Sequence, residues 1–141
     1  MSAVVVGVDG SEGSLRALRW AARHARSTGA RLRAVWAWSY LDQPFERFDP
    51  EYGEDDARRS LGEALAALGD EASGLDVEPV VVCDLAARAL LDSAKDADLV
   101  VVGSRGVGGF EGLLLGSVSS QVASHAACPV VVVPGGERAA N

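Results

Sequence analysis

Continuous apolar runs rich in valine constrain the fold of this chain more than any other feature of its sequence. The runs cover residues 3–8, 32–38, 77–82, 99–103 and 130–133. A strand with one face in water alternates apolar and polar side chains, whereas a strand covered on both faces is apolar throughout. The runs therefore predict the strands of a parallel sheet that is buried on both sides.

Helical patterns lie between these runs. Ser11 is a good N-cap for a helix that continues to Thr28 and ends at Gly29. A further helix is expected directly after the loop 39–54, with apolar residues from Ala57 to Ala72 on one face and its end near Gly74. Two more helices are expected over residues 85–95 and 117–126. Strands and helices that alternate with short connections predict an α/β domain, in which a doubly wound, five-stranded parallel sheet carries helices on both faces. The length of 141 residues fits a single domain over residues 1–141.

Composition narrows the class of protein. With 48% hydrophobic and 23% charged residues, the chain has ordinary globular usage, and no segment approaches the apolar length of a membrane span. The N-terminus shows neither a basic region nor a cleavage site, so we expect a cytoplasmic protein without a membrane partner. The net charge of −7 argues against nucleic-acid binding. Four arginines at positions 16, 19, 23 and 26 recur at helical spacing, and we interpret them as one solvated helix face.

The two cysteines give no sign of a metal or redox site. Cys83 and Cys128 are far apart, form no C-x-x-C motif and have no histidine beside them at metal-ligand spacing. Neither a zinc site nor a disulfide framework is expected. We therefore predict that both behave as small, buried apolar residues.

A glycine-rich segment follows the fourth apolar run. Residues 103–117 read GSRGVGGFEGLLLGS, and Ser117 opens a short helical pattern. Glycine lets the backbone approach a ligand closely and adopt positive φ. A strand, a glycine loop and a helix start are together typical of a phosphate cradle, because free backbone N–H groups and the helix dipole favour an anion.

Two better-known phosphate loops do not match this segment. A Walker loop requires Gly-Lys-Ser/Thr at the helix start, but Leu115 precedes Gly116 and the loop holds no lysine. A dinucleotide fingerprint requires G-x-G-x-x-G, but Glu111 stands where the third glycine belongs after Gly106 and Gly108.

The spacing Gly103, Gly106, Gly116, Ser117 is G-2x-G-9x-G-S, and it resembles the motif of the universal stress protein family in its ATP-binding branch. The likeness covers nearly the whole chain. It includes the segments 4–15, 98–106, 115–119 and 125–133, which resemble the first strand and helix start, the fourth strand and its loop, and the closing helix and strand of the family. The resemblance implies the strand order 3-2-1-4-5.

This order predicts where a ligand binds. In an open α/β sheet the site lies at the carboxyl ends of the strands where the winding direction reverses, here between the first and fourth strands. Asp9 and Gly103 end those strands, so a carboxylate and a phosphate-binding backbone are expected to meet in one cleft. The resemblance places the nucleotide-contacting aspartate of the family at Asp9. Alternatively, Asp9 is only the turn residue before Ser11.

The resemblance also implies the remaining nucleotide contacts. Gly103, Gly106, Gly116 and Ser117 surround the phosphates, with Val118 beside them, and Mg²⁺ binds the phosphate oxygens. Arg105 either offsets phosphate charge or is an exposed loop residue.

Adenine is expected at main-chain atoms near Ala37, at the end of the second strand. Core packing is favoured over base stacking for the neighbouring Trp36 and Trp38. Cys83-Asp84-Leu85 departs from the glycine that the family often carries after the third strand, which puts a ligand contact there in doubt. The loop 39–54 either closes over the base or packs at the domain edge.

A catalytic role has little support in these residues. Hydrolysis of a triphosphate needs a base and strong charge stabilisation, whereas the predicted cleft offers Asp9 and Arg105 but no lysine, and His125 is expected only to cap or pack. We therefore expect an ATP-binding regulatory or stress-response factor that is at most a slow ATPase. The alternatives are a nucleotide-independent dimeric scaffold or chaperone-like factor, and a phosphoacceptor receiver domain, for which the paired acids and late lysine are missing. A homodimer is expected through the edge strand 130–133.

Overall fold

The computed structural model describes residues 2–39, 53–104 and 115–135. Five parallel strands form one sheet in the order β3-β2-β1-β4-β5, which confirms the predicted topology. The strands are β1 (Ala3–Gly7), β2 (Arg31–Trp38), β3 (Val77–Cys83), β4 (Leu99–Gly103) and β5 (Val130–Val133). Their bounds agree with the valine-rich runs to within about one residue, because continuous apolar runs are what a doubly covered sheet requires.

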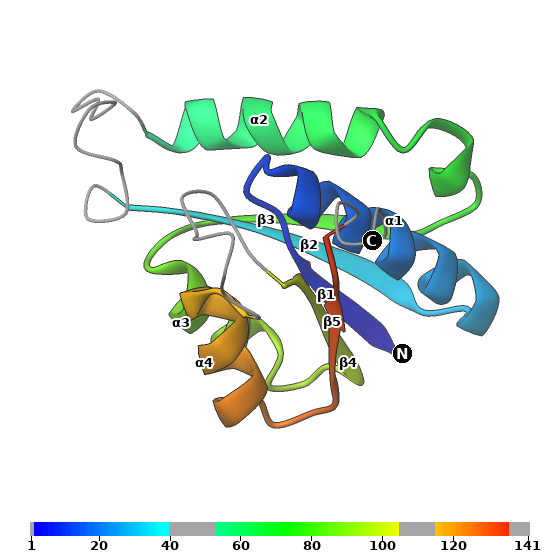
Figure 1. The fold of residues 1–141 in the computed structure, drawn as a ribbon. Coiled ribbons are helices and arrows are strands. Elements are labelled where there is room, and N and C mark those ends of the chain that lie inside the picture. Colours follow the sequence, from blue (N-terminus) through cyan, green and yellow to red (C-terminus); the bar gives the residue numbers. More distant parts are fainter. Residues whose placement is uncertain (1, 40–52, 105–114, 136–141) are drawn as a thin grey trace.

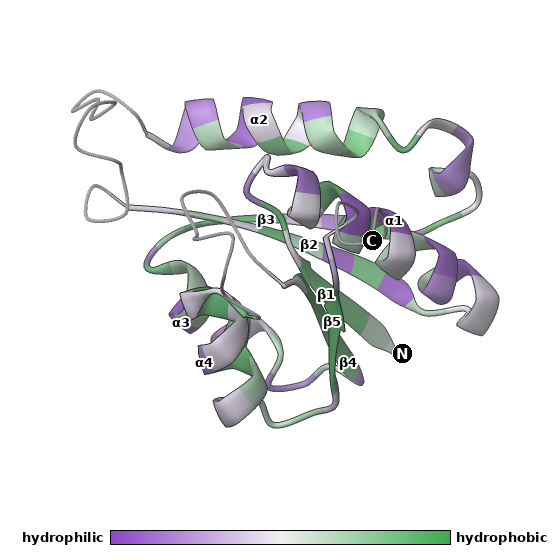
Figure 2. Cartoon of the chain, viewed as in Figure 1, coloured by the Kyte–Doolittle hydropathy of each residue, from purple (hydrophilic) through white to green (hydrophobic). Residues whose placement is uncertain are grey.

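Helices cover both faces of this sheet (Figure 1). They are α1 (Glu12–Thr28), α2 (Glu54–Ala66), α3 (Ala86–Ser93) and α4 (Ser117–His125), with a 3₁₀ turn η3 (Gly69–Ala72) after α2. The helices α1 and α2 lie on one face, and α3 and α4 lie on the other (Figure 1). Figure 2 shows apolar residues along the strands and polar residues on the outer sides of the helices.

The sheet divides the core into two apolar clusters. Val4, Val6 and Val101 pack beneath α1 and α2, whereas Val5 and Val100 pack beneath α3 and α4. Neighbouring residues of one strand thus pack into opposite clusters, because side chains alternate between the two faces along a strand. All five of these valines are almost completely buried.

The first helix has the predicted ends. Ser11 is the N-cap, and its side chain accepts a hydrogen bond from the backbone N–H of Ser14. Gly29 is the C-cap in the left-handed region at φ 75°, a conformation that glycine adopts without the clash of a Cβ atom.

The helix predicted between the loop 39–54 and Gly74 ends earlier than expected. Helix α2 begins at Glu54, close to the expected start, and the side chain of Asp56 accepts a hydrogen bond from the N–H of Gly53. Three acidic residues in this first turn suit the positive end of the helix dipole. The helix ends at Ala66, and the chain continues as the 3₁₀ turn, which starts at Gly69 with φ 54°. Positive φ at Gly69 is incompatible with a continuous α-helix.

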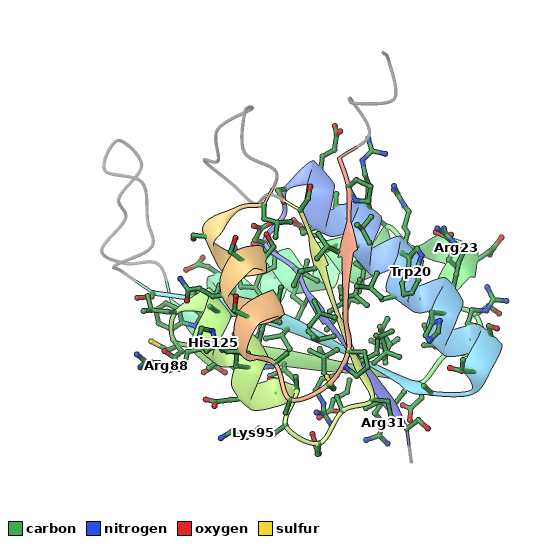
Figure 3. The ribbon with its side chains drawn as sticks, turned by 60° about the horizontal axis from the view of Figure 1, so that its bottom comes forward. Trp20, Arg23, Arg31, Arg88, Lys95 and His125 are labelled. Carbon is green, nitrogen blue, oxygen red and sulfur yellow. The ribbon has the colours of Figure 1, made fainter. Side chains whose placement is uncertain are left out.

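Three of the four arginines of α1 are exposed, as predicted, and these three also hold a neighbouring element, whereas Arg16 is half-buried and pairs with Glu12 of the same helix. Arg23 Nη1 lies 3.0 Å from Glu71 Oε2, and Arg19 Nε lies 3.9 Å from the other oxygen of that carboxylate. Arg26 Nη1 donates to the carbonyl oxygen of Asp70 at 3.3 Å. This face of α1 therefore fixes the 3₁₀ turn against the helix, and Figure 3 shows Arg23 extending from it.

The prediction of two buried cysteines is wrong for Cys83. That residue is exposed, because it ends the edge strand β3. Cys128 is half-buried against the cluster beneath α3 and α4, and burial raises the pKa of its thiol. Among the described residues, no three histidine, cysteine or acidic side chains are grouped so that they could hold a metal ion.

Candidate functional site

A cavity lies where the winding of the sheet reverses, at the carboxyl ends of β1 and β4. These two strands are paired, with Val4, Val5 and Val6 opposite Leu99, Val100 and Val101. The cavity is lined from both strand ends, from β2 and from the first turns of three helices. Its lining includes Gly7, Asp9, Ser11, Ser14, Ala37, Ala86, Leu90, Gly103, Val118 and Ser119. The structure thus brings together Asp9, Ala37, Gly103 and Val118 of the predicted site.

Asp9 lies in a tight polar turn between β1 and α1. Its Oδ1 accepts hydrogen bonds from the backbone N–H of Ser11 at 2.9 Å and from the hydroxyl of Ser11 at 2.5 Å. The backbone N–H of Asp9 donates to Ser14 Oγ at 3.1 Å. Asp9 is therefore a turn residue, as one interpretation of the sequence proposed. The same turn places Asp9 in the lining of the cavity.

Gly103 brings β4 unusually close to α1. A Cβ atom at this position would lie 2.9 Å from both the carbonyl carbon and the oxygen of Gly13. Because those are backbone atoms in the first turn of α1, a larger residue could not be accommodated by a change of rotamer. Glycine is thus required here by the packing of strand against helix, whatever a ligand also requires.

The two motif glycines that the structure describes, Gly103 and Gly116, do not adopt positive φ. Gly116 is the N-cap of α4 with φ −77° and ψ 178°, which is extended backbone, and Gly103 is not among the glycines with positive φ. Gly116 is buried, and Ser117, the first residue of α4, is exposed beyond it. Close approach, rather than left-handed backbone, is what the structure shows at Gly103.

Two helix starts give the cavity a favourable field for an anion. Ala86 of α3 and Val118 of α4 line it, and neither helix has an acidic residue in its first turn. In addition, Gly116 offers no side chain to cap α4. At α4 the positive end of the helix dipole is therefore not offset by a first-turn carboxylate, whereas Asp84 Oδ1 accepts a hydrogen bond from the N–H of Leu85 directly before α3 at 2.7 Å. A negatively charged ligand is thus favoured above all at the start of α4.

The side chains of Ala37 and Trp36 lie on opposite faces of the sheet, because successive side chains alternate along a strand. Ala37 lines the cavity and packs against the cluster beneath α3 and α4. Trp36 points to the other cluster, and its Cη2 atom lies 3.4 Å from the position of a Cβ on Gly10. Core packing, which the sequence favoured for Trp36, is confirmed. The indole supports the turn that carries Asp9.

Sequence reasoning missed Ser14 and Ser119, the two buried polar residues among those described. The Ser14 hydroxyl donates to the carbonyl of Ser11 at 3.1 Å, and the Ser119 hydroxyl donates to the carbonyl of Ser104 at 2.9 Å. A serine two or three residues into an otherwise apolar helix face is the signal that could have found both, since a buried hydroxyl needs a partner.

Several predicted features of the site fall outside the described residues. They are Arg105, Gly106 and most of the loop 39–54. Within the described part of the chain, no lysine, arginine or histidine lines the cavity. His125 has a local role, as predicted: its Nδ1 lies 3.0 Å from the carbonyl oxygen of Gln121 within α4.

A second hollow is lined by residues of α1, β1, β4 and β5. It is lined by residues that include Trp20, His24 and Val131. The rings of Trp20 and His24 stack with centroids 5.1 Å apart and an angle of 9° between their planes. Figure 3 shows Trp20 on α1. The hollow shares no lining residue with the first cavity.

A doubly wound parallel sheet with a polar turn and two uncapped helix starts at its switch point defines the class of α/β domains that bind ligands at that point. The chain belongs to the universal stress protein family, whose model matches residues 1–134. In the part of the chain that the structure describes, no helix has both the length and the apolar character of a membrane span.

Individual relatives agree with this assignment. The universal stress protein Rv2005c of Mycobacterium tuberculosis is 42% identical over 130 residues, which are 92% of this chain and 44% of the relative. The chain thus spans about half the length of that curated relative. A solved universal stress protein in complex with cAMP is 32% identical, with a TM-score of 0.71 and coverage of 94% of this chain and 95% of that one. A universal stress protein from Archaeoglobus fulgidus is 26% identical, also with a TM-score of 0.71, covering 94% and 93% of the two chains.

Proposed function

We propose that this domain binds an adenine nucleotide, ATP above all, in the cavity at the switch point and acts as a nucleotide-dependent regulatory or stress-response factor. The observation that carries the proposal is the meeting of Asp9, Ala37, Gly103 and Val118 around one cavity, although they are up to 109 residues apart in sequence. The cAMP bound by a solved relative that is 32% identical supports adenine as the base.

Each part of a nucleotide has a suitable surface in this cavity. The apolar residues Val35, Ala37 and Leu90 offer contact to a base, and main-chain atoms at the end of β2 offer hydrogen bonds. The start of α4, with Gly116, Ser117 and Val118, offers N–H groups to phosphates. Gly106 and Arg105 remain part of the proposed phosphate loop, on the strength of the sequence motif alone.

The donor set fits Mg²⁺ carried by the nucleotide better than a metal held by the protein alone. Mg²⁺ in nucleotide sites binds phosphate oxygens, water and one or two carboxylates. Asp9 is the one acidic residue in the described lining of the cavity, and its Oδ1 is already engaged with Ser11. Asp9 would therefore assist a nucleotide-bound ion, whose charge would offset that of the phosphates.

Hydrolysis is expected to be slow or absent. Fast transfer of a phosphoryl group needs a positioned water, a base and concentrated positive charge. The described lining supplies one carboxylate and no cationic side chain. The alternative, a dimeric scaffold that does not depend on nucleotide, has in its favour the unpaired outer edge of β5 among the described strands.

A homodimer through β5 belongs to the same proposal. The outer edge of this strand offers main-chain N–H and C=O groups, and a second copy related by a two-fold axis would pair with them. We also propose that residues 1–141 form one domain that works in the cytoplasm.

Calorimetric titration with Mg-ATP, AMP and cAMP tests nucleotide binding. The sharpest site variant is Ser117→Glu, because Ser117 is exposed at the start of α4, where a carboxylate suits the helix dipole and preserves the fold. The same carboxylate would repel phosphates, so binding of Mg-ATP should be lost. Ser120→Glu, at an exposed position one turn further along α4, is the matched control and should bind as the unsubstituted protein does. If both variants bind Mg-ATP as tightly as the unsubstituted protein does, the site lies elsewhere.

A further inference from the structure

The carbonyl oxygen of Ser104 joins the end of β4 to the first turn of α4. It accepts hydrogen bonds from the backbone N–H of Gly116 at 2.6 Å and from the hydroxyl of Ser119 at 2.9 Å. The N–H of Ser104 donates to the carbonyl of Val133 at 2.9 Å, which ties the same residue to β5. Ser104 is thus held from both sides, directly after Gly103.

Ser119 is the side-chain part of this junction. It is only 2% exposed, and its hydroxyl also lies 3.2 Å from the carbonyl oxygen of Gly116. One hydroxyl proton is therefore shared between two carbonyl groups, one on each side of the gap between β4 and α4. No other side chain bonds to the Ser104 carbonyl among the contacts of the described residues.

The junction controls the direction of the α4 N-terminus. The first-turn N–H groups of α4 have no side-chain cap from Gly116, and Val118 and Ser119 line the cavity beside Gly103. The angle between the end of β4 and the start of α4 decides whether those N–H groups converge on the space above Gly103. Because hydrogen bonding to an anion depends steeply on distance and angle, a small rotation of the helix start would weaken it.

We propose that Ser119 is a positioning residue of the nucleotide site, which acts by holding the start of α4 against Ser104 so that the helix N–H groups face the phosphates. This inference rests on the proposed function, because it concerns the same cavity. Ser119 itself donates to protein carbonyls and is not assigned a contact with the nucleotide.

Three substitutions at Ser119 test the role of its hydroxyl. Ser119→Ala removes the donor, and the dissociation constant for Mg-ATP should rise about fivefold to tenfold, as the loss of one buried hydrogen bond predicts. Ser119→Thr keeps the hydroxyl and should restore the affinity to within about threefold. Ser119→Cys keeps the size with a weaker donor, so it should fall between the two and serves if the alanine variant does not fold. Ser120→Ala is the matched control, since it makes the same change on an exposed position of α4.

A second readout separates positioning from mere stabilisation. Amide hydrogen exchange of the nucleotide-free protein should be faster at Gly116 and Ser120 in the alanine variant, because their N–H groups donate to the carbonyls of Ser104 and Gly116, and it should be unchanged in the strands. If the alanine variant is less stable but binds Mg-ATP as tightly as the unsubstituted protein, Ser119 is only structural and the inference is wrong. If the unsubstituted protein binds no adenine nucleotide, the proposed function fails first, and this inference fails with it.

Discussion

Gly103 is the residue at which the packing of a strand against a helix makes the strictest demand for glycine. Its missing Cβ lets β4 approach the backbone of Gly13 to a distance that no other residue allows. Gly7 faces a softer neighbour, because the atom nearest to its missing Cβ is Cδ1 of Leu90, at 2.9 Å. The two glycines therefore form a natural comparison between a rigid and a flexible contact.

We predict that Gly103→Ala lowers the free energy of unfolding by about 1–3 kcal/mol, the usual cost of overpacking. Gly7→Ala should cost less, because the end of the Leu90 side chain can move whereas the backbone of Gly13 cannot. Urea denaturation followed by circular dichroism measures both. An equal or smaller cost at Gly103 would show that α1 yields easily, contrary to the contact described above.

A second prediction at this scale concerns turnover. Since no cationic side chain lines the described part of the cavity, phosphate release from Mg-ATP should be far below the roughly 10 s⁻¹ typical of enzymes. A steady-state phosphate-release assay measures it, with the Ser117→Glu variant as the control for contaminating activity. Several turnovers per second that disappear in this variant would make the protein an enzyme.

At the scale of elements, Arg33 connects three of them at the end of the sheet opposite the cavity. Its side chain is only 16% exposed and is paired with Glu78 of β3 and with Asp96 beyond α3, at 3.1 and 2.9 Å. It also donates to the carbonyl of Ser93, the last residue of α3, at 2.7 Å. The hydrogen bond from Arg33 is the main cause of the lowered pKa of the Asp96 carboxyl, and that bond raises the pKa of Arg33 in turn.

This pair predicts a dependence of stability on pH. Folding lowers the pKa of Asp96 below the ordinary value of about 3.9, so the charged form is the one that the folded state favours. The stabilisation is therefore fully present above about pH 5 and is lost as the pH falls through the folded-state pKa. Asp96→Asn should be less stable than the unsubstituted protein at pH 7, and the difference should shrink toward pH 3. A difference that stays constant over this range in urea denaturation would contradict the assignment.

The elements also show what could be predicted from sequence. The strands followed from valine runs, and α1 followed from Ser11 and Gly29, because these signals are local. The contact between Arg23 and Glu71 joins residues that are 48 positions apart, so no local sequence pattern could predict it. Cys83 was misplaced for a similar reason: its exposure depends on β3 being the edge of the sheet, which strand order decides.

The candidate site also contains residues that could be predicted from the sequence and residues that could not. Asp9 and Gly103 could be brought together from topology alone, once the strand order was inferred from the family resemblance. The buried hydroxyls of Ser14 and Ser119 could not, because their roles depend on which carbonyl groups the folded chain brings within 3 Å or so. Spacing identified the glycines, but only packing showed why Gly103 must be one.

At the scale of the whole molecule, β5 is an edge strand of the described sheet, and its outer edge carries the proposed dimer contact. Val100 N–H donates to the carbonyl of Pro129, and Ser104 N–H donates to that of Val133. In a parallel ladder alternate residues face the same neighbour, so the main-chain groups of Val130 and Val132 point to the outer edge. The side chains of these valines remain half-buried on the faces of the sheet.

We predict that the protein is a dimer and that Val132→Pro converts it to a monomer, because proline removes an outward N–H and is tolerated on an edge strand. Val132→Ala loses similar side-chain packing but keeps the N–H, so it should remain a dimer. Sedimentation equilibrium at micromolar concentrations distinguishes the two states, and circular dichroism confirms folding. A monomeric unsubstituted protein, with or without ATP, would end the proposal of a β5 dimer.

The most direct test of nucleotide binding at the switch point is a titration of the ¹⁵N-labelled protein with Mg-ATP, followed by amide chemical shifts. We predict saturable shifts at Asp9, Ala37, Gly103 and Val118, which line the cavity, with little change at Trp20 and the rest of the second hollow. Contradiction would take one of two forms: no shifts at millimolar nucleotide, or shifts that gather around Trp20, His24 and Val131 while the residues of the cavity stay unchanged.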